Sequence, residues 1–125
     1  MKRDMELCRI LLLTIEDQYN DSAIGNLEVE GYDMATIAYH CGLLYDAGLI
    51  KSFNSKNADN HIYWFSVGAL TWEGHNFIDN IREDTIWNAT KNTIKERTLP
   101  MTLEVIKDIS STIISALVTG TIAGI

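Results

Sequence analysis

The chain has 125 residues, with 10 Lys plus Arg against 17 Asp plus Glu and a formal net charge of −7. This length supports one domain with a sizeable core and removes the need for metal or disulfide support, while 46% apolar and 22% charged residues exclude a disordered chain. The acidic balance also excludes a protein that coats nucleic acid by bulk charge.

The first half of the chain alternates helix and strand signals. Apolar residues repeat at helical spacing from about residue 4 to 19, which predicts an amphipathic helix. Apolar and acidic residues alternate at 27–30, which predicts a short half-buried strand. Asp33 is expected to cap a second helix, and Gly48 is expected to end it in the left-handed conformation.

A β-hairpin is expected after the second helix. Residues 49–53 and 61–66 are rich in the apolar, aromatic and β-branched side chains that are typical of strands. The polar residues between them, 54–60, predict a turn, so the hairpin should have a long, flexible tip.

The remaining elements are expected to be helical. Thr71 should cap a helix, and Asp84 either caps a fresh helix or lies within a continuous one. Pro100 ends the run. A last helix, apolar over a wide arc, is expected from about Met101 to about Thr119 and must be buried against another surface.

This order of elements predicts an α+β fold: a winged-helix-like domain made of helix, strand, helix, hairpin wing and helix, plus a C-terminal helix. Two segments support it. Residues 37–50 contain a His, then a Leu, then Ala-Gly-Leu-Ile, and they resemble the recognition-helix segment of winged-helix proteins. Residues 70–78 resemble the Leu-Thr and Glu-Gly motif that follows the wing in the same superfamily.

Several stretches resemble a more specific family, a domain-of-unknown-function family numbered twenty-five thirteen, which occurs in small bacterial and prophage proteins. They are residues 1–7, 28–32, 39–50, 71–75 and 81–88. The resemblance covers most of residues 1–97 and implies a phage or mobile-element setting. It brings no activity and no catalytic residues.

The sequence departs from the winged-helix pattern in one place. The helix that usually precedes the recognition helix is absent or very short, because the predicted strand leads almost directly into Asp33. We expect one winged-helix-like domain at residues 1–97 and a helical tail at residues 98–125 that mediates self-association.

Charge placement argues against a standard DNA-reading helix. Residues 1–50 carry 3 basic and 9 acidic residues, and the outward face of the second helix has no Lys or Arg. Direct readout and phosphate contacts need such side chains, and only the hairpin is net positive. Both DNA and a protein partner therefore stay open, and the candidate contact residues for either are Thr36, Tyr39, His40, Leu43, Lys51 and Lys56, with Lys2 or Arg3 added for DNA.

Catalytic and metal sites are not expected. The chain has no glycine-rich phosphate loop, no nucleophile elbow and no metal-ligand spacing. Cys41 lies on the apolar stripe of its helix and is expected in the core. We expect no enzyme activity, no cofactor and no metal.

The tail helix has two interpretations: it folds back on its own domain, or it pairs with its counterpart in a homodimer or higher homo-oligomer, which we favour. The expected interface residues are Leu103, Ile106, Ile109, Ile113 and Leu117. Residues 109–125 lack charge, but their serines, threonines and glycines argue against a membrane span. Two cysteines are too few for a disulfide scaffold and predict a cytoplasmic protein.

Taken together, these features predict a small non-catalytic regulatory or adaptor protein of phage or mobile-element type, with winged-helix DNA binding. The alternative is a protein-interaction module that binds no nucleic acid.

Overall fold

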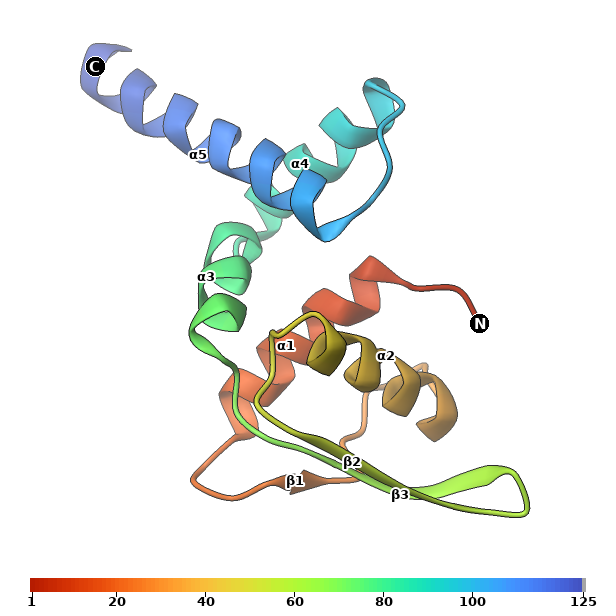
Figure 1. The fold of residues 1–125 in the computed structure, drawn as a ribbon. Helices are drawn as coiled ribbons and strands as arrows, with labels where there is room; N and C mark the ends of the chain where they lie inside the picture. The colour runs from red at the N-terminus through yellow and green to blue at the C-terminus, as the bar shows by residue number, and fades with distance from the viewer. Residues whose placement is uncertain (125) are drawn as a thin grey trace. The chain divides into compact units, whose positions relative to one another are not determined.

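The computed structural model describes residues 1–124, and side chains as far as residue 120. Within this part of the chain the fold is α+β, with five helices and a three-stranded antiparallel sheet (Figure 1), as the sequence predicts. The order of elements is compatible with the expected one. In chain order they are α1 (Met5–Gln18), β1 (Ile24–Gly25), α2 (Met34–Asp46), β2 (Phe53–Ala58), β3 (His61–Val67), α3 (Trp72–Ile81), α4 (Asp84–Glu96) and α5 (Leu103–Gly124).

The chain divides into two compact units, Met1–Asn76 and Phe77–Ile125. The predicted domain boundary at residue 97 lies inside the second unit, and the assignment of residues 1–97 and 98–125 to separate domains stays a prediction. None of the described helices combines the length and the apolar character that crossing a membrane requires.

Both predicted helices of the first unit are confirmed. Asp33 caps the second as expected, and Asp4, for which no capping role was predicted, caps the first. The Asp4 carboxylate accepts the Leu7 N–H at 3.2 Å, and the Asp33 carboxylate accepts the Thr36 N–H at 2.9 Å. These bonds satisfy N–H groups that the first helical turn leaves unpaired. Gly48 has φ +76°, the left-handed conformation expected after α2.

The strand predicted at 27–30 does not form; the expectation was wrong. Strand β1 lies earlier in the chain and pairs Ile24 with Val67 and Gly25 with Ser66. Asn26 then turns the chain away from the sheet with φ +48°, and its side-chain oxygen accepts the Phe65 N–H at 3.0 Å. The alternation that predicted a strand therefore belongs to a loop.

The hairpin is confirmed, but its tip is short where a long one was expected. Asp59 and Asn60 form the turn alone, with φ +52° and +64°, the values of a two-residue type I′ connection. Strands β2 and β3 pair from Phe53 opposite Val67 to Ala58 opposite His61. Residues 54–57 are polar and still form a strand, because they lie on an exposed edge, where no apolar face is required.

Helix α3 begins at the predicted cap. The Thr71 hydroxyl accepts the Gly74 N–H at 3.0 Å and donates to the Gly48 carbonyl at 2.6 Å. The Thr71 N–H also donates to the Leu49 carbonyl at 3.0 Å. The Leu-Thr and Glu-Gly motif therefore joins the start of α3 to the chain that leaves α2.

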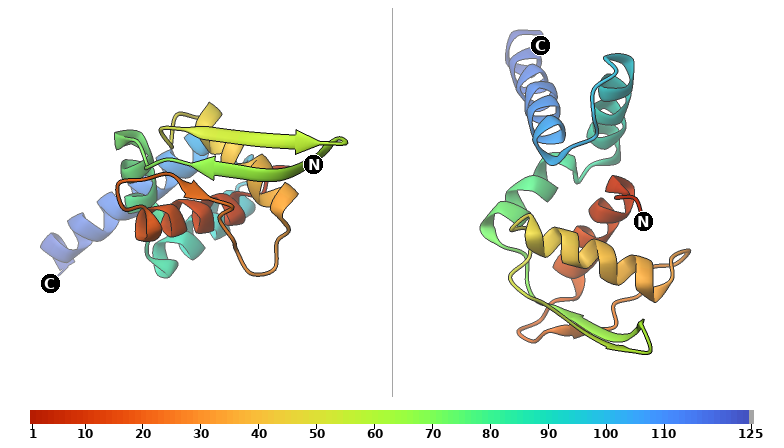
Figure 2. Two further views of the ribbon diagram at one scale, coloured as in Figure 1. Left: turned by 90° about the horizontal axis from the view of Figure 1, so that it is seen from below. Right: turned by 45° about the vertical axis from the view of Figure 1, so that its right-hand side comes forward.

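The second unit contains the end of α3 and the helices α4 and α5. A break near Glu83 makes α4 a separate helix. Helices α4 and α5 lie close together at their first turns and separate toward their C-terminal ends (Figure 2). Trp87, Ile94 and Ile106 are buried there, and the Asn80 amide donates to the Ser110 and Ser111 hydroxyls of α5.

The two cysteines are buried free thiols in the first unit. Burial raises the pKa of Cys8 from 9.0 to about 11 and that of Cys41 from 9.0 to about 12, because desolvation penalises the thiolate. A pKa that is higher in the folded state means that the neutral thiols stabilise the fold fully below pH 9. That contribution decreases as the pH rises from 9 through about 11.

We expect both thiols to be nearly inert in the folded protein. At pH 7.5 a chromogenic disulfide reagent should react with them at least about 100-fold more slowly than in guanidinium chloride, since the thiolate is the reactive form. The unfolded protein is the control. Reaction at similar rates in both states would contradict burial of the two thiols.

Candidate functional site

A groove of about 430 Å³ separates α2 from the β2–β3 hairpin. The views in Figures 1 and 2 show α2 running alongside the hairpin. We call this the helix–hairpin groove. The residues that line it are Met1, Ala35, Ala38, Tyr39, Gly42, Leu43 and Asp46 on one side and Phe53, Ser55, Asn57, Asn60 and Ile62 on the other.

The hairpin side of the groove follows from strand alternation. Successive side chains of a strand point to opposite faces, so Phe53, Ser55 and Asn57 share the face toward α2, whereas Lys56 belongs to the other face. A register shift between Lys56 and Asn57 brings Ile62 onto the groove face as the partner of Asn57.

On the α2 side of the groove, apolar side chains flank Gly42, which has no side chain. A Cβ atom added to Gly42 would lie 3.4 Å from Cε2 of Phe53. The missing side chain therefore lets the Phe53 ring approach the helix and form the floor of the groove. Tyr39 and Leu43 flank this contact on α2.

The groove is mostly apolar. Among the described residues that line it, Asp46 is the only one with a charged side chain, and Met1 adds the α-amino group. A surface that reads base edges or clamps phosphates uses Arg, Lys, Asn and Gln. Of these the groove has only Asn57 and Asn60, while its aromatic and aliphatic side chains are typical of the centre of a protein interface.

The structure brings only part of the predicted contact set together. Tyr39 and Leu43 line the groove, while Thr36 lies in the first turn of α2, half-buried. Lys51 and Lys56 are exposed, and Lys56 places Nζ 5.0 Å from the centre of the Trp64 ring, its cross-strand partner. Lys56 therefore lies on the opposite hairpin face from the groove.

His40 was predicted as a contact residue, and the structure corrects this. Its side chain is only 1% exposed, and both ring nitrogens are engaged. Nε2 accepts the Asp4 N–H at 2.8 Å, and Nδ1 lies 2.8 Å from the Thr36 carbonyl. Because a carbonyl only accepts and a backbone N–H only donates, these two bonds fit the tautomer that carries its proton on Nδ1. His40 joins α2 to the start of α1 and is unavailable to a partner.

The predicted interface residues of α5 divide into two groups. Ile106 is fully buried within the chain, so it is unavailable to a second copy as a surface residue. Leu103, Ile109 and Ile113 are half-buried. Leu117 is 54% exposed, as is Val118 beside it, so the apolar surface of α5 that is open to solvent lies in its second half.

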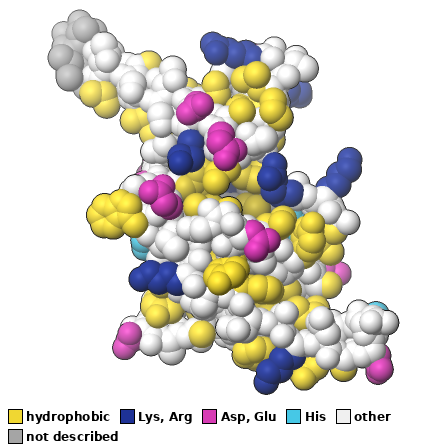
Figure 3. All heavy atoms as spheres, in the orientation of Figure 1, with side chains coloured by type: hydrophobic (Ala, Val, Ile, Leu, Met, Phe, Trp, Pro, Cys, Tyr) yellow, Lys and Arg dark blue, Asp and Glu magenta, His cyan; other side chains and the backbone are white. Residues whose placement is uncertain are grey.

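Basic side chains do not form a continuous surface on the face shown in Figure 3. Lys and Arg side chains occur there singly or in pairs, separated by neutral and acidic ones. Lys2 and Arg3 are exposed at the N-terminus. On this face the described residues provide no band along which a nucleic-acid backbone could lie.

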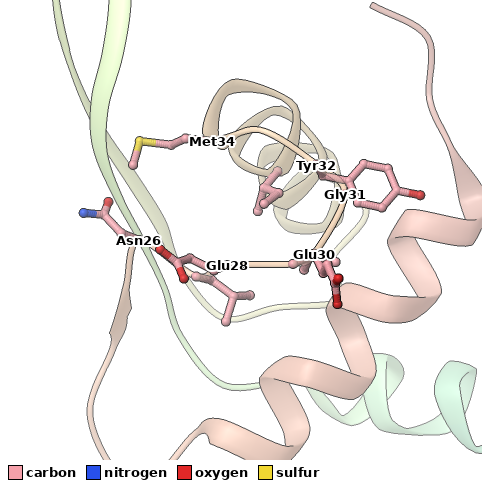
Figure 4. A pocket seen from close by; sticks show the side chains of 9 residues that line it. Asn26, Glu28, Glu30, Gly31, Tyr32 and Met34 are labelled. Atoms are coloured by element: carbon pink, nitrogen blue, oxygen red, sulfur yellow. The ribbon is translucent and has the colours of Figure 1, made fainter.

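A second cavity, of about 550 Å³, lies under the loop between β1 and α2. Leu27 and Ile37 at this cavity are buried, and Glu28 and Glu30 lie at its rim, with Tyr32 pointing away from the opening (Figure 4). The sequence indicated the acidic residues but not the cavity, because the cavity exists only where the chain arches away from β1.

Other ionisable side chains take part in a helix cap or in a surface contact. Asp33 is the α2 cap, and its hydrogen bonds to Thr36 lower the pKa of its carboxyl. On the surface, the carboxylate oxygen Oε2 of Glu16 lies 3.2 Å from Nδ1 of His75. Within the described residues no three His, Cys, Asp or Glu side chains lie where they could hold a metal ion together.

Comparison with known proteins gives two matches. The family described as "Hypothetical protein (DUF2513)" matches residues 2–100, which include the loop cavity and every lining residue of the groove except Met1. A protein of Haemophilus influenzae described as "Uncharacterized protein" is 42% identical over 120 residues, which is 92% of this chain and 97% of the relative. No solved structure matches the chain.

Proposed function

The chain belongs to the DUF2513 family, and from the geometry of its groove we propose that it is a small, non-catalytic regulatory or adaptor protein that acts by binding a protein partner. The observation that carries the proposal is the helix–hairpin groove. Its lining is mostly apolar and aromatic, and its only charged side chain among the described residues is the acidic Asp46. Such a lining suits a desolvated protein contact better than a phosphate backbone.

The proposal includes a cytoplasmic location in a phage or mobile-element setting. Two buried free thiols support a reducing compartment. The setting follows from the family resemblance of the sequence motifs.

The proposal is tested by two matched α2 variants. Tyr39 and Tyr45 are both tyrosines of α2 and are 43% and 47% exposed, but only Tyr39 lines the groove. Proteins that immobilised wild type retains from a lysate of the encoding bacterium are identified and purified, and their affinity is measured. Tyr39→Ala and Leu43→Asp should each weaken binding by about ten-fold or more, whereas Tyr45→Ala should not. Equal binding by all four forms would overturn the proposal.

DNA binding through the hairpin is the second candidate, and one observation favours it. The exposed Lys56 and the half-buried Trp64 form a cation–aromatic pair on the outer hairpin face. Basic and aromatic side chains together are a combination that binds single-stranded nucleic acid in other proteins. Duplex binding that falls steeply with salt and is lost in a Lys51→Glu, Lys56→Glu double variant would support this candidate in place of the groove. Absence of any mobility shift at low salt would reject it.

We also propose that the protein self-associates through the second half of α5. Leu117 and Val118 are exposed there, and no charged residue occurs after Asp108. In a chain of net charge −7, this is a surface where two identical copies meet without repulsion between like charges.

A Leu117→Glu, Val118→Glu double variant should convert the oligomer to a monomer, because it places acidic charge at the interface of both copies. It leaves the buried Ile106 in place, so the packing of α4 and α5 is preserved. Light scattering measures the mass, and circular dichroism checks that the helices remain. An unchanged mass, or a monomeric wild type, would reject this interface.

A further inference from the structure

Strand β2 has an open edge beside the helix–hairpin groove. The sheet order is β1-β3-β2, so among the described residues β2 pairs with β3 alone. Four of its six residues are polar, at positions 54–57, and all of 54–58 are exposed. The outer side of β2 therefore presents backbone groups to solvent rather than to another strand.

The hydrogen bonds of Phe65 show which β2 groups point outward. Its N–H donates to the Asn26 side chain and its carbonyl accepts the Asn26 N–H, both on the β1 side. Phe65 therefore exchanges no hydrogen bonds with its cross-strand partner Ser55, and the N–H and carbonyl of Ser55 point to the open edge. By alternation, so do those of Phe53 and Asn57.

The residues with outward backbone groups are also those whose side chains line the groove. A strand added to this edge would bond to Phe53, Ser55 and Asn57 through its backbone. Every second side chain of that strand would point to the side occupied by α2. The same added strand would therefore form hydrogen bonds with the open edge of β2 and place side chains in the groove.

The lining determines the chemistry of the added segment. An apolar side chain fits against Tyr39, Leu43 and Phe53, and a Lys or Arg fits beside Asp46. Residues 1–50, which include all of α2, carry 3 basic and 9 acidic residues, and this balance favours a basic partner. The β2 strand of a second copy fits poorly, because its alternate residues Ser55 and Asn57 supply neither the apolar nor the basic side chain that this lining favours.

We propose that β2 and the helix–hairpin groove bind an extended segment of a basic partner protein as a fourth strand of the sheet. This mode of recognition takes affinity from backbone hydrogen bonds and specificity from pockets for alternate side chains. The inference rests on the proposed function, because it specifies how the groove holds its protein partner.

The test selects peptides from a random dodecapeptide display library on the full-length protein and measures the selected peptides by fluorescence anisotropy. The decisive variant is Ser55→Pro. Proline removes an N–H that no internal bond uses, at an edge position where proline is tolerated in sheets. Ser55→Ala is its control, since it removes the hydroxyl and keeps the N–H. Equal melting temperatures of the two variants and wild type confirm that the hairpin is intact.

The expected result is enrichment of peptides in which an apolar residue and a Lys or Arg are two or four positions apart, so that both side chains lie on the face toward α2. Ser55→Pro should bind them about ten-fold or more weakly, and Ser55→Ala should bind them normally. As a second measurement that needs no protein variant, N-methylation of alternate peptide residues should abolish binding in one register and not in the other.

Other outcomes separate this inference from the proposed function. If Tyr39→Ala weakens peptide binding but Ser55→Pro and N-methylation do not, the groove binds its partner without strand addition and the inference is overturned alone. If the library gives no groove-dependent peptide, the inference is overturned whatever the lysate experiment shows. Competition by duplex DNA, or displacement of peptide by self-association through β2, would also overturn it.

Discussion

Gly74→Ala is expected to lower the free energy of unfolding of the first unit by about 3 kcal/mol or more, because the new methyl group has no room. A Cβ atom at this position would collide with the Leu49 carbonyl oxygen and lie 3.0 Å from the Leu49 carbonyl carbon. Both contacts are with backbone, which cannot rotate aside. The start of α3 would have to move away and weaken the Thr71 to Leu49 hydrogen bond.

Urea unfolding followed by near-ultraviolet circular dichroism measures this effect. Glu73→Ala is the matched control, since Glu73 is the exposed neighbour on the same helical turn; it should change stability by no more than about 0.5 kcal/mol. An unfolding midpoint of Gly74→Ala equal to that of the control would show that α3 does not press against the Leu49 carbonyl.

His40→Ala should destabilise the first unit by about 2–4 kcal/mol, since two costs add. It leaves a cavity in a buried site, and it leaves the Asp4 N–H, which now donates to Nε2 at 2.8 Å, without its acceptor. The N-terminal end of α1 should therefore loosen first, because its cap residue is held to α2 by this bond.

Tyr39→Ala provides the comparison for this effect, because Tyr39 is the exposed neighbour of His40. It should change stability little while it weakens partner binding, and hydrogen exchange at the first turn of α1 should increase only in His40→Ala. A stable His40→Ala protein that has lost partner binding would restore the interpretation of His40 as a contact residue.

The helices were predictable because their signals are local. Asp4, Asp33 and Thr71 act as caps through bonds that reach only three residues along the chain, and Gly48 ends α2 through its own backbone conformation. Such features depend little on the rest of the fold. The strands were harder, since β1 and the polar half of β2 exist through their pairing with β3.

The candidate site was predictable only in part, for a related reason. Periodicity placed Tyr39, His40 and Leu43 on α2 but could not distinguish their surroundings. Other elements, namely α1, β2 and β3, pack against α2. A polar residue next to its apolar stripe can therefore be either exposed or buried, and the periodicity does not decide which. The N-terminus of α1, 36 residues away in the chain, decides that His40 is buried.

The sequence by itself determined the α+β composition, most helix boundaries, the hairpin and the family, because these follow from side-chain periodicity, capping and motif order. Tertiary structure decided which polar residues are structural, where the groove lies and that β2 keeps an open edge. Those properties arise from contacts between segments far apart in the chain: Asn26 with Phe65, Gly42 with Phe53, and Asp4 with His40. No local pattern encodes such a contact, since each partner is defined only once the other has been brought beside it.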